Sequence, residues 1–152
     1  MKGIVVYYSR WGNLRTIAEN VSRGIEETGH TLTLMDVREI DFLDRDLDFV
    51  VVGSPTRFGR MSRPIRRFIK RNITDAWDGK PFAAFGTCLE SESGGNASRD
   101  IWKKLLAKGL EPLNSPFCAR VSHVKGPLLD GEAERAHEFG KVVGEGLKTE
   151  IE

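Results

Sequence analysis

The sequence predicts an α/β fold in which helices cover both faces of a parallel sheet, and three observations support this. Strand-like and helix-like patterns alternate along all 152 residues. Three short stretches, 4–8, 49–52 and 82–85, are apolar throughout, as is typical of central parallel strands buried on both faces. Polar loops that contain glycine follow the same stretches, and in such sheets ligands bind beyond the carboxyl ends of the strands.

The first part of the chain predicts two strands with a helix between them. Residues 4–8 predict the first strand. An apolar stripe with helical spacing then predicts a helix, formed by Leu14, Ile17, Ala18, Val21 and Ile25. Gly29 is suited to end this helix, because glycine tolerates the left-handed conformation found there. Residues 31–37 alternate in polarity and predict an edge strand, whereas the acidic segment 36–48 predicts a loop.

The middle of the chain continues the alternation with a strand, a helix and a strand. Residues 49–52 predict the third strand and residues 82–85 the fourth. Residues 61–73 predict a helix that carries Pro64 in its first turn, where the missing N–H has little cost.

The last part of the chain predicts a helix, an edge strand and a closing helix. Residues 97–108 predict a helix that Gly109 closes, and residues 113–121 predict a fifth strand, at an edge because Pro116 interrupts it. Residues 132–147 predict the closing helix, with four inward-facing residues: Ala136, Phe139, Val143 and Leu147. Without an internal repeat or linker, we expect one domain over residues 1–152.

The composition narrows the possible functions. The net charge is +1, which gives no support for nucleic-acid binding or attraction to acidic membranes. Cys88 and Cys118 are too few for a disulfide scaffold or a four-cysteine metal site, and we expect reduced, partly buried thiols. No stretch approaches the roughly 20 apolar residues of a membrane span. The first strand begins at residues 3–4 without a signal peptide, so we expect a cytoplasmic protein.

The first polar loop predicts a phosphate site. Ser9, Gly12 and Asn13 come directly after a strand and directly before a helix. A helix N-terminus offers unpaired backbone N–H groups and the positive end of the helix dipole, which suit an anion. Side chains of Ser9, Asn13 and Thr16 could add donors. With a second loop at 53–59 and a third at 86–96, the pattern predicts a phosphorylated, flat, aromatic cofactor.

Other phosphate-binding and phosphate-processing classes do not fit these loops. The first loop lacks the three glycines of the dinucleotide fingerprint and the lysine of a P-loop. Phospho-acceptor domains need acidic residues where this chain has Tyr8-Ser9 and Gly53-Ser54. Low-molecular-weight phosphatases need an early cysteine, and the first one here is Cys88.

The loops resemble those of flavodoxin-fold FMN proteins, and most of all those of the tryptophan-repressor-binding-protein-like NAD(P)H:quinone oxidoreductases. In that group the first loop reads Ser-x-Tyr-Gly-His-Ile-x-Thr, and residues 9–16 read Ser-Arg-Trp-Gly-Asn-Leu-Arg-Thr. The second loop reads Pro-Thr-Arg-Phe-Gly-Asn-Met, and residues 55–61 depart from it only at Arg60. The likeness covers almost the whole chain and weakens after residue 87.

The resemblance implies a flavodoxin-like three-layer sandwich around a five-stranded parallel sheet of order 2-1-3-4-5, with FMN bound non-covalently. The residues implied to cradle the phosphate, or to lie beside it, are Ser9, Arg10, Trp11, Gly12, Asn13 and Leu14. Those implied to line the isoalloxazine ring are Pro55, Thr56, Arg57, Phe58 and Gly59. Those implied to border the pyrimidine or ribityl side are Gly86, Thr87, Cys88 and Leu89. No catalytic residue and no metal ligand is implied.

Two regions depart from the family pattern. The third loop of the family is rich in threonine and glycine, whereas residues 86–95 here read Gly-Thr-Cys-Leu-Glu-Ser-Glu-Ser-Gly-Gly. The long insertion that precedes the last helix in the quinone reductases is largely missing. In the family these regions shape the pocket and help the subunits to assemble. The resemblance therefore leaves both alternatives, a monomer and a homo-oligomer.

Basic residues follow the second loop without any acidic residue between positions 57 and 71. They are Arg57, Arg60, Arg63, Arg66, Arg67, Lys70 and Arg71. We interpret the segment 66–71 as a solvated helix face, whereas Arg57 and Arg60 belong to the implied flavin loop. A cationic rim attracts anionic NAD(P)H. It therefore favours an NAD(P)H-dependent reductase of quinones or similar acceptors over a non-enzymatic carrier that docks to partner redox proteins. A third reading is a domain that has lost its flavin.

The remaining aromatic and titratable residues give weaker signals. We expect His30 to be exposed at a turn and His137 to face solvent. His123 follows the fifth strand, and we favour a position away from the flavin edge over an approach to it. Trp102 lies on a helical stripe, which favours a core position over a flavin contact. A hydride transfer to flavin needs orientation more than a proton donor.

Overall fold

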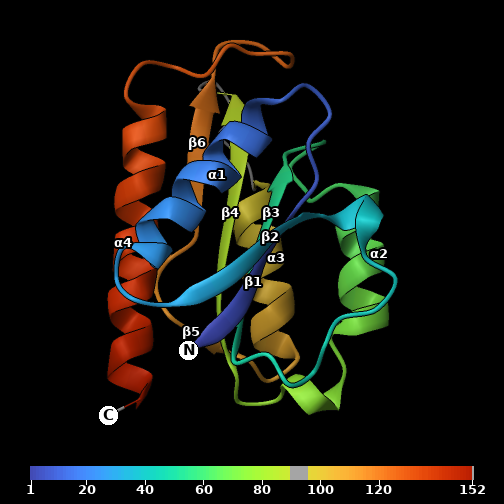
Figure 1. The fold of residues 1–152 in the computed structure, drawn as a ribbon. Helices are drawn as coiled ribbons and strands as arrows, with labels where there is room; N and C mark the ends of the chain where they lie inside the picture. Colours follow the sequence, from blue (N-terminus) through green and yellow to red (C-terminus); the bar gives the residue numbers. More distant parts are fainter. Residues whose placement is uncertain (90–95, 152) are drawn as a thin grey trace.

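The computed structural model describes residues 1–89 and 96–151, and it has three layers with the parallel sheet in the middle (Figure 1). The strands are β1 (Lys2–Tyr7), β2 (Thr31–Asp36), β3 (Phe49–Pro55), β4 (Pro81–Leu89), β5 (Glu111–Pro112) and β6 (Phe117–Val121). The helices are α1 (Asn13–Glu26), α2 (Arg63–Asn72), α3 (Ala97–Ala107) and α4 (Glu132–Ile151), with 3-10 turns at Val37–Glu39 and Asp75–Trp77. The predicted α/β sandwich is confirmed.

The sheet has the order β2-β1-β3-β4-β5, and β6 also pairs with β4. All of these pairs are parallel. The predicted order 2-1-3-4-5 is therefore confirmed, with a sixth strand added. Tyr7 pairs with Gly53, and Ser54 pairs with Gly86, so the carboxyl ends of β1, β3 and β4 meet at one edge of the sheet.

The two faces of the sheet support separate hydrophobic cores. Helices α1 and α4 cover one face and α2 and α3 cover the other (Figure 1). Gly24 of α1 and Gly140 of α4 face each other so closely that a Cβ on either would overlap the partner's backbone. The four residues predicted to face inward from α4 are all buried: Ala136, Phe139, Val143 and Leu147.

Several predicted element ends were wrong. Strands β3 and β4 reach Pro55 and Leu89, because backbone pairing continues beyond the apolar residues. Gly86, Thr87, Cys88 and Leu89 are thus strand residues rather than loop residues. The predicted strand 113–121 begins only at Phe117, because Pro116 cannot donate to the ladder, and a separate short strand, β5, comes before the predicted range.

Two histidine predictions also need correction. His30 is buried, and its Nε2 lies 2.9 Å from the carbonyl oxygen of Gly144, so it joins the turn after α1 to α4. His137 is only 24% exposed, and its Nε2 lies 2.8 Å from a carboxylate oxygen of Glu27. Both histidines therefore help to hold α4 against the rest of the fold. No helix in the described ranges is long and apolar enough to cross a membrane.

Candidate functional site

A cavity of about 370 Å³ opens at the carboxyl edge of the sheet, where strands β1, β3, β4 and β6 end. Nine residues singled out from the sequence line it: Arg10, Trp11, Pro55, Thr56, Arg57, Phe58, Thr87, Cys88 and Leu89. Tyr8, Val121 and Val124 complete the lining and were missed. Cavities of several hundred Å³ that combine apolar walls with a few polar groups are typical ligand sites.

The first loop forms a ring around the hydroxyl of Ser9. The Ser9 Oγ accepts hydrogen bonds from the backbone N–H of Gly12 at 3.1 Å and of Arg15 at 3.2 Å. Gly12 has φ 92°, a conformation that favours glycine, and its carbonyl accepts the N–H of Thr16 as α1 begins. The amides at this helix start thus converge on an oxygen atom, as they would on a phosphate oxygen.

The polar side chains of this loop have partners within the chain. Asn13 donates from Nδ2 to the carbonyl of Lys125 at 3.0 Å, and Thr16 donates to the carbonyl of Gly12 at 3.2 Å. Ser9, Gly12 and Asn13 lie beside the cavity rather than in its wall, and the Leu14 side chain is buried in the core under α1. Their predicted role as phosphate ligands therefore depends mainly on backbone donors.

Trp11 and its neighbours make one rim of the cavity positive. The indole is 44% exposed, with the guanidinium of Arg10 at 5.0 Å and the ammonium of Lys125 at 4.8 Å from the ring. These cation–π contacts hold two positive charges at the mouth. Among the described lining residues, the charged ones are both arginines, Arg10 and Arg57.

The second loop contains a tight turn that presents Phe58 to solvent. Arg57 and Arg60 exchange backbone hydrogen bonds of 2.9 and 3.0 Å, and the two residues between them have positive φ, 51° for Phe58 and 77° for Gly59. This is the pattern of a type I′ turn, in which glycine or asparagine normally occupies the first central position. Phe58 is 97% exposed, so hydrophobic burial does not compensate its backbone strain.

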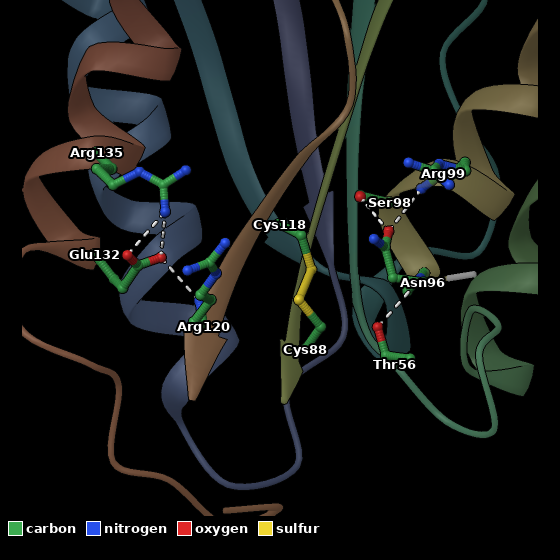
Figure 2. Close-up of a disulfide and its surroundings, with 10 residues drawn as sticks. Thr56, Cys88, Asn96, Ser98, Arg99, Cys118, Arg120, Glu132 and Arg135 are labelled. Carbon is green, nitrogen blue, oxygen red and sulfur yellow. Dashed lines mark hydrogen bonds and ion pairs between the residues drawn. A yellow bond between two sulfur atoms is a disulfide. The ribbon is translucent and has the colours of Figure 1, made fainter. Parts of the chain in front are cut away.

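Thr56 connects this turn to the neighbouring elements. Its N–H donates to the carbonyl of Thr87 on β4 at 3.0 Å. Its Oγ1 accepts from the N–H of Ala97 at the start of α3, also at 3.0 Å (Figure 2). The turn therefore projects from a fixed base. Gly59 lies within it, beside the cavity wall.

The end of β4 forms a further wall of the cavity. Cys88 lies there, and the prediction that the two cysteines are reduced thiols was wrong. Cys88 and Cys118 form a disulfide with their Cα atoms 6.2 Å apart (Figure 2). Cys118 pairs with Gly86 and Cys88 pairs with Arg120, which makes the cysteines diagonal neighbours on adjacent strands. Their separation of 30 residues concealed this proximity in the sequence. Cys88 lines the cavity, so the disulfide lies at the site.

Gly86, the first residue of the predicted third loop, contributes packing rather than lining. A Cβ on Gly86 would lie 2.6 Å from the carbonyl oxygen of Ser54, so this glycine allows close strand pairing. Residues 90–95 lie outside the described ranges. Behind β6, the buried carboxylate of Glu132 accepts from the N–H of Arg120 at 2.8 Å and from Arg135 (Figure 2).

An ion pair supports Tyr8 from the edge of the sheet. The Arg38 guanidinium donates to the Asp36 carboxylate at 2.6 and 3.0 Å, and this holds the pKa of Asp36 below its usual range. The same guanidinium lies 5.4 Å from the ring of Tyr8, which lines the cavity. Burial raises the pKa of the adjacent Tyr7 phenol.

Two other residues lie away from the cavity. Trp102 packs against Phe82 and donates from Nε1 to the carbonyl of Asn114 at 2.9 Å, so its predicted core position is confirmed. His123 is exposed and does not line the cavity, which agrees with the position away from the flavin edge that the sequence favoured. Among the described residues, no cluster of three or more His, Cys, Asp or Glu side chains could hold a metal ion.

Comparison with known proteins gives consistent matches. The model of the flavodoxin domain family matches residues 4–121. A protein from Azorhizobium caulinodans named NAD(P)H dehydrogenase (quinone) is 30% identical, with 99% of this chain and 89% of the relative covered. The aligned region spans 178 positions, so the relative carries residues that this 152-residue chain lacks. The protein of the same name from Cupriavidus metallidurans is 27% identical over the same shares.

Solved structures share the fold. A flavodoxin from the domain Archaea superposes with a TM-score of 0.82 at 26% identity, covering 97% of this chain and 99% of that one. A flavodoxin, WrbA-like protein from Agrobacterium tumefaciens superposes with a TM-score of 0.73 at 21% identity, covering 97% and 98%.

Proposed function

The chain belongs to the flavodoxin domain family, and from this premise we propose that it binds FMN at the carboxyl edge of the sheet and passes electrons from NAD(P)H to a quinone or a similar acceptor. Relatives that cover nearly the whole chain bear the name NAD(P)H dehydrogenase (quinone). Bound FMN supplies reversible two-electron hydride acceptance together with stepwise release of electrons.

The residues fit this cofactor. The amides that converge on Ser9 Oγ are suited to a phosphate, and the cavity beside them has room for a flat ring system. Trp11 and Phe58 offer exposed aromatic surface at two sides of this cavity. Apolar walls next to a polar anion site match the two halves of a flavin mononucleotide.

One observation carries the proposal of a reductase: arginine supplies all the charge among the described lining residues of the cavity. Arg10 and Arg57 attract an anionic donor and raise its local concentration at the mouth. Apolar walls exclude water and restrict the donor's ring to a few orientations, which is the main requirement of hydride transfer.

A second candidate is a non-enzymatic electron carrier to partner redox proteins. The likeness to the archaeal flavodoxin supports it, because that likeness extends over 99% of that chain. The alignment also supports it, since within the aligned region the dehydrogenase from Azorhizobium caulinodans carries residues that this chain lacks.

An anaerobic titration of the FMN-loaded protein distinguishes the candidates. We expect stoichiometric NADPH or NADH to bleach the visible flavin absorbance in the absence of any other protein. Bleaching only through an added redox protein would instead support the carrier. A folded, colourless preparation that does not bind added FMN would contradict both candidates.

Location, assembly and domain organisation stay predictions. A cytoplasmic location loses its reduced-thiol argument, because Cys88 and Cys118 are joined. A homo-oligomer and a single domain over residues 1–152 are testable by light scattering and limited proteolysis.

A further inference from the structure

A larger groove adjoins the cavity on the side of α2. Its volume is about 750 Å³, and it shares Tyr8, Arg57 and Phe58 with the cavity wall. Beyond these shared residues, Pro64 gives it apolar surface, whereas Met61, which also lines it, is only 3% exposed. The two hollows are therefore adjacent, with Tyr8, Arg57 and Phe58 between them, and one extended ligand can contact both.

Four arginines line this groove: Arg57, Arg60, Arg63 and Arg66. Within residues 1–89 and 96–151, none of their guanidinium groups forms an ion pair or a side-chain hydrogen bond. The carboxylate of Asp100 lies nearby, but it accepts the backbone N–H of Met61 at 3.0 Å. We call this feature the arginine groove.

The arrangement of these cations is unfavourable without a ligand. Arg57 and Arg60 are directly opposite each other in the turn, and like charges in that position are destabilising. Arg63 and Arg66 lie three residues apart on α2, where like charges also repel. The strained conformation of Phe58 between the first two adds to the cost. A bound polyanion would offset the two repulsive terms.

We propose that the arginine groove binds the phosphates of NADPH and selects NADPH over NADH through the 2′-phosphate. This inference rests on the proposed function for the identity of the donor. The diphosphate of a nicotinamide dinucleotide carries about two negative charges, and a 2′-phosphomonoester adds roughly 1.5 to 2 more. Four guanidinium groups match the larger total, and each can bind phosphate oxygens in a bidentate manner.

The shape of the groove favours a nucleotide over an acidic protein surface. Tyr8 and Pro64 provide apolar surface on which an adenosine can pack, and the four arginines line the same groove. The groove adjoins the flavin cavity at the shared residues, so a dinucleotide bound in the groove can reach the cavity. A flat acidic protein surface would instead contact the basic residues of α2 inside and outside the groove equally.

Binding of nucleotide fragments tests the proposal with no need for flavin chemistry. Calorimetry would compare adenosine 2′,5′-bisphosphate with adenosine 5′-monophosphate, and we expect the bisphosphate to bind at least about tenfold more tightly. The R63Q/R66Q double variant should lose this preference. The R67Q/R71Q double variant removes the same charge from exposed positions of α2 outside the groove, and it should keep the preference within about twofold.

The outcomes separate this inference from the proposed function. Equal binding of the two nucleotides, or equal losses in both double variants, would overturn the selection of NADPH. FMN-loaded protein that NADH and NADPH bleach equally well would overturn it too, while the proposed reductase would survive. A preference for the bisphosphate in protein that never oxidises NADPH would support the groove and contradict the reductase. Circular dichroism of each variant checks that it is folded.

Discussion

The first loop, residues 9–16, and the turn at residues 57–60 lie at the same edge of the sheet, yet they satisfy their polar groups in opposite ways. In the first loop, Ser9, Asn13 and Thr16 all have hydrogen-bond partners inside the chain. In the turn, the described structure gives the side chains of Arg57 and Arg60 no ion pair, and Phe58 is 97% exposed.

This difference indicates two modes of recognition. A loop held by its own hydrogen bonds presents backbone amides with little ordering cost on binding, because the geometry already exists. A turn with a strained residue and unpaired charges instead gains stability when a ligand contacts it. We therefore expect backbone changes to dominate binding at the first loop and side-chain changes to dominate at the turn.

Gly12→Val should give the largest effect, because it changes the backbone conformation that presents the amides of the first loop. A β-branched residue is disfavoured at φ 92°, so the amides would no longer converge. We expect FMN affinity to fall by at least about 100-fold, roughly 2.7 kcal/mol, measured by quenching of flavin fluorescence.

Gly29→Val provides a matched control for that variant. Gly29 has φ 100°, and a Cβ at either glycine would meet open space, so the two substitutions introduce a similar strain. Gly29→Val should destabilise the fold to a similar extent and leave FMN affinity intact. Equal flavin loss in both variants would refute the phosphate role of the first loop.

Phe58→Asn should stabilise the fold but weaken FMN binding, because it relieves the strained backbone of the turn and removes its aromatic side chain. Asparagine tolerates positive φ, so we expect the free energy of unfolding to rise by about 1 kcal/mol. Loss of the aromatic ring should weaken FMN binding about tenfold. Chemical denaturation and flavin titration measure the two quantities.

Phe42→Asn controls for the loss of an exposed ring. Phe42 is 81% exposed, and its φ is not positive. Neither stability nor FMN affinity should change appreciably in this variant. A Phe58→Asn protein that is no more stable and binds FMN normally would show that the turn holds no strain for function.

The architecture was predictable from the sequence because its signals are local. Uninterrupted apolar stretches at 49–52 and 82–85 indicated central strands, and the stripe on α4 indicated its buried face. The ends of β3 and β4 were not predictable in this way. Pro55 and Leu89 are held in strands by backbone pairing to neighbours, and hydrophobicity does not record such pairing.

The site was predictable where its residues follow a strand directly, as Trp11 and Phe58 do. Val121 and Val124 reach the cavity from β6 and the segment after it, which only the three-dimensional pairing with β4 reveals. The disulfide depends on that same pairing. The roles of the predicted flavin ligands stay predictions until FMN binding is measured.

The ion pair of Arg38 with Asp36 should give the smallest effect. Unlike the arginines of the groove, Arg38 has a carboxylate partner within the chain. Its hydrogen bond lowers the pKa of Asp36, so the ionised pair stabilises the folded state above the unfolded pKa of Asp36, and this contribution is lost as pH falls through the folded pKa. Asp36→Asn should therefore lower the free energy of unfolding by about 0.5 kcal/mol at neutral pH.

The pH dependence of stability shows whether the effect of Asp36→Asn comes from the ion pair. Below both pKa values of Asp36, the wild type and Asp36→Asn should have the same free energy of unfolding, because the wild-type carboxyl is then neutral too. Denaturation curves recorded between acidic and neutral pH measure the difference. If the difference stayed constant across that range, the ion pair would contribute nothing. The contrast between a paired arginine and the unpaired arginines of the groove would then carry no energetic meaning.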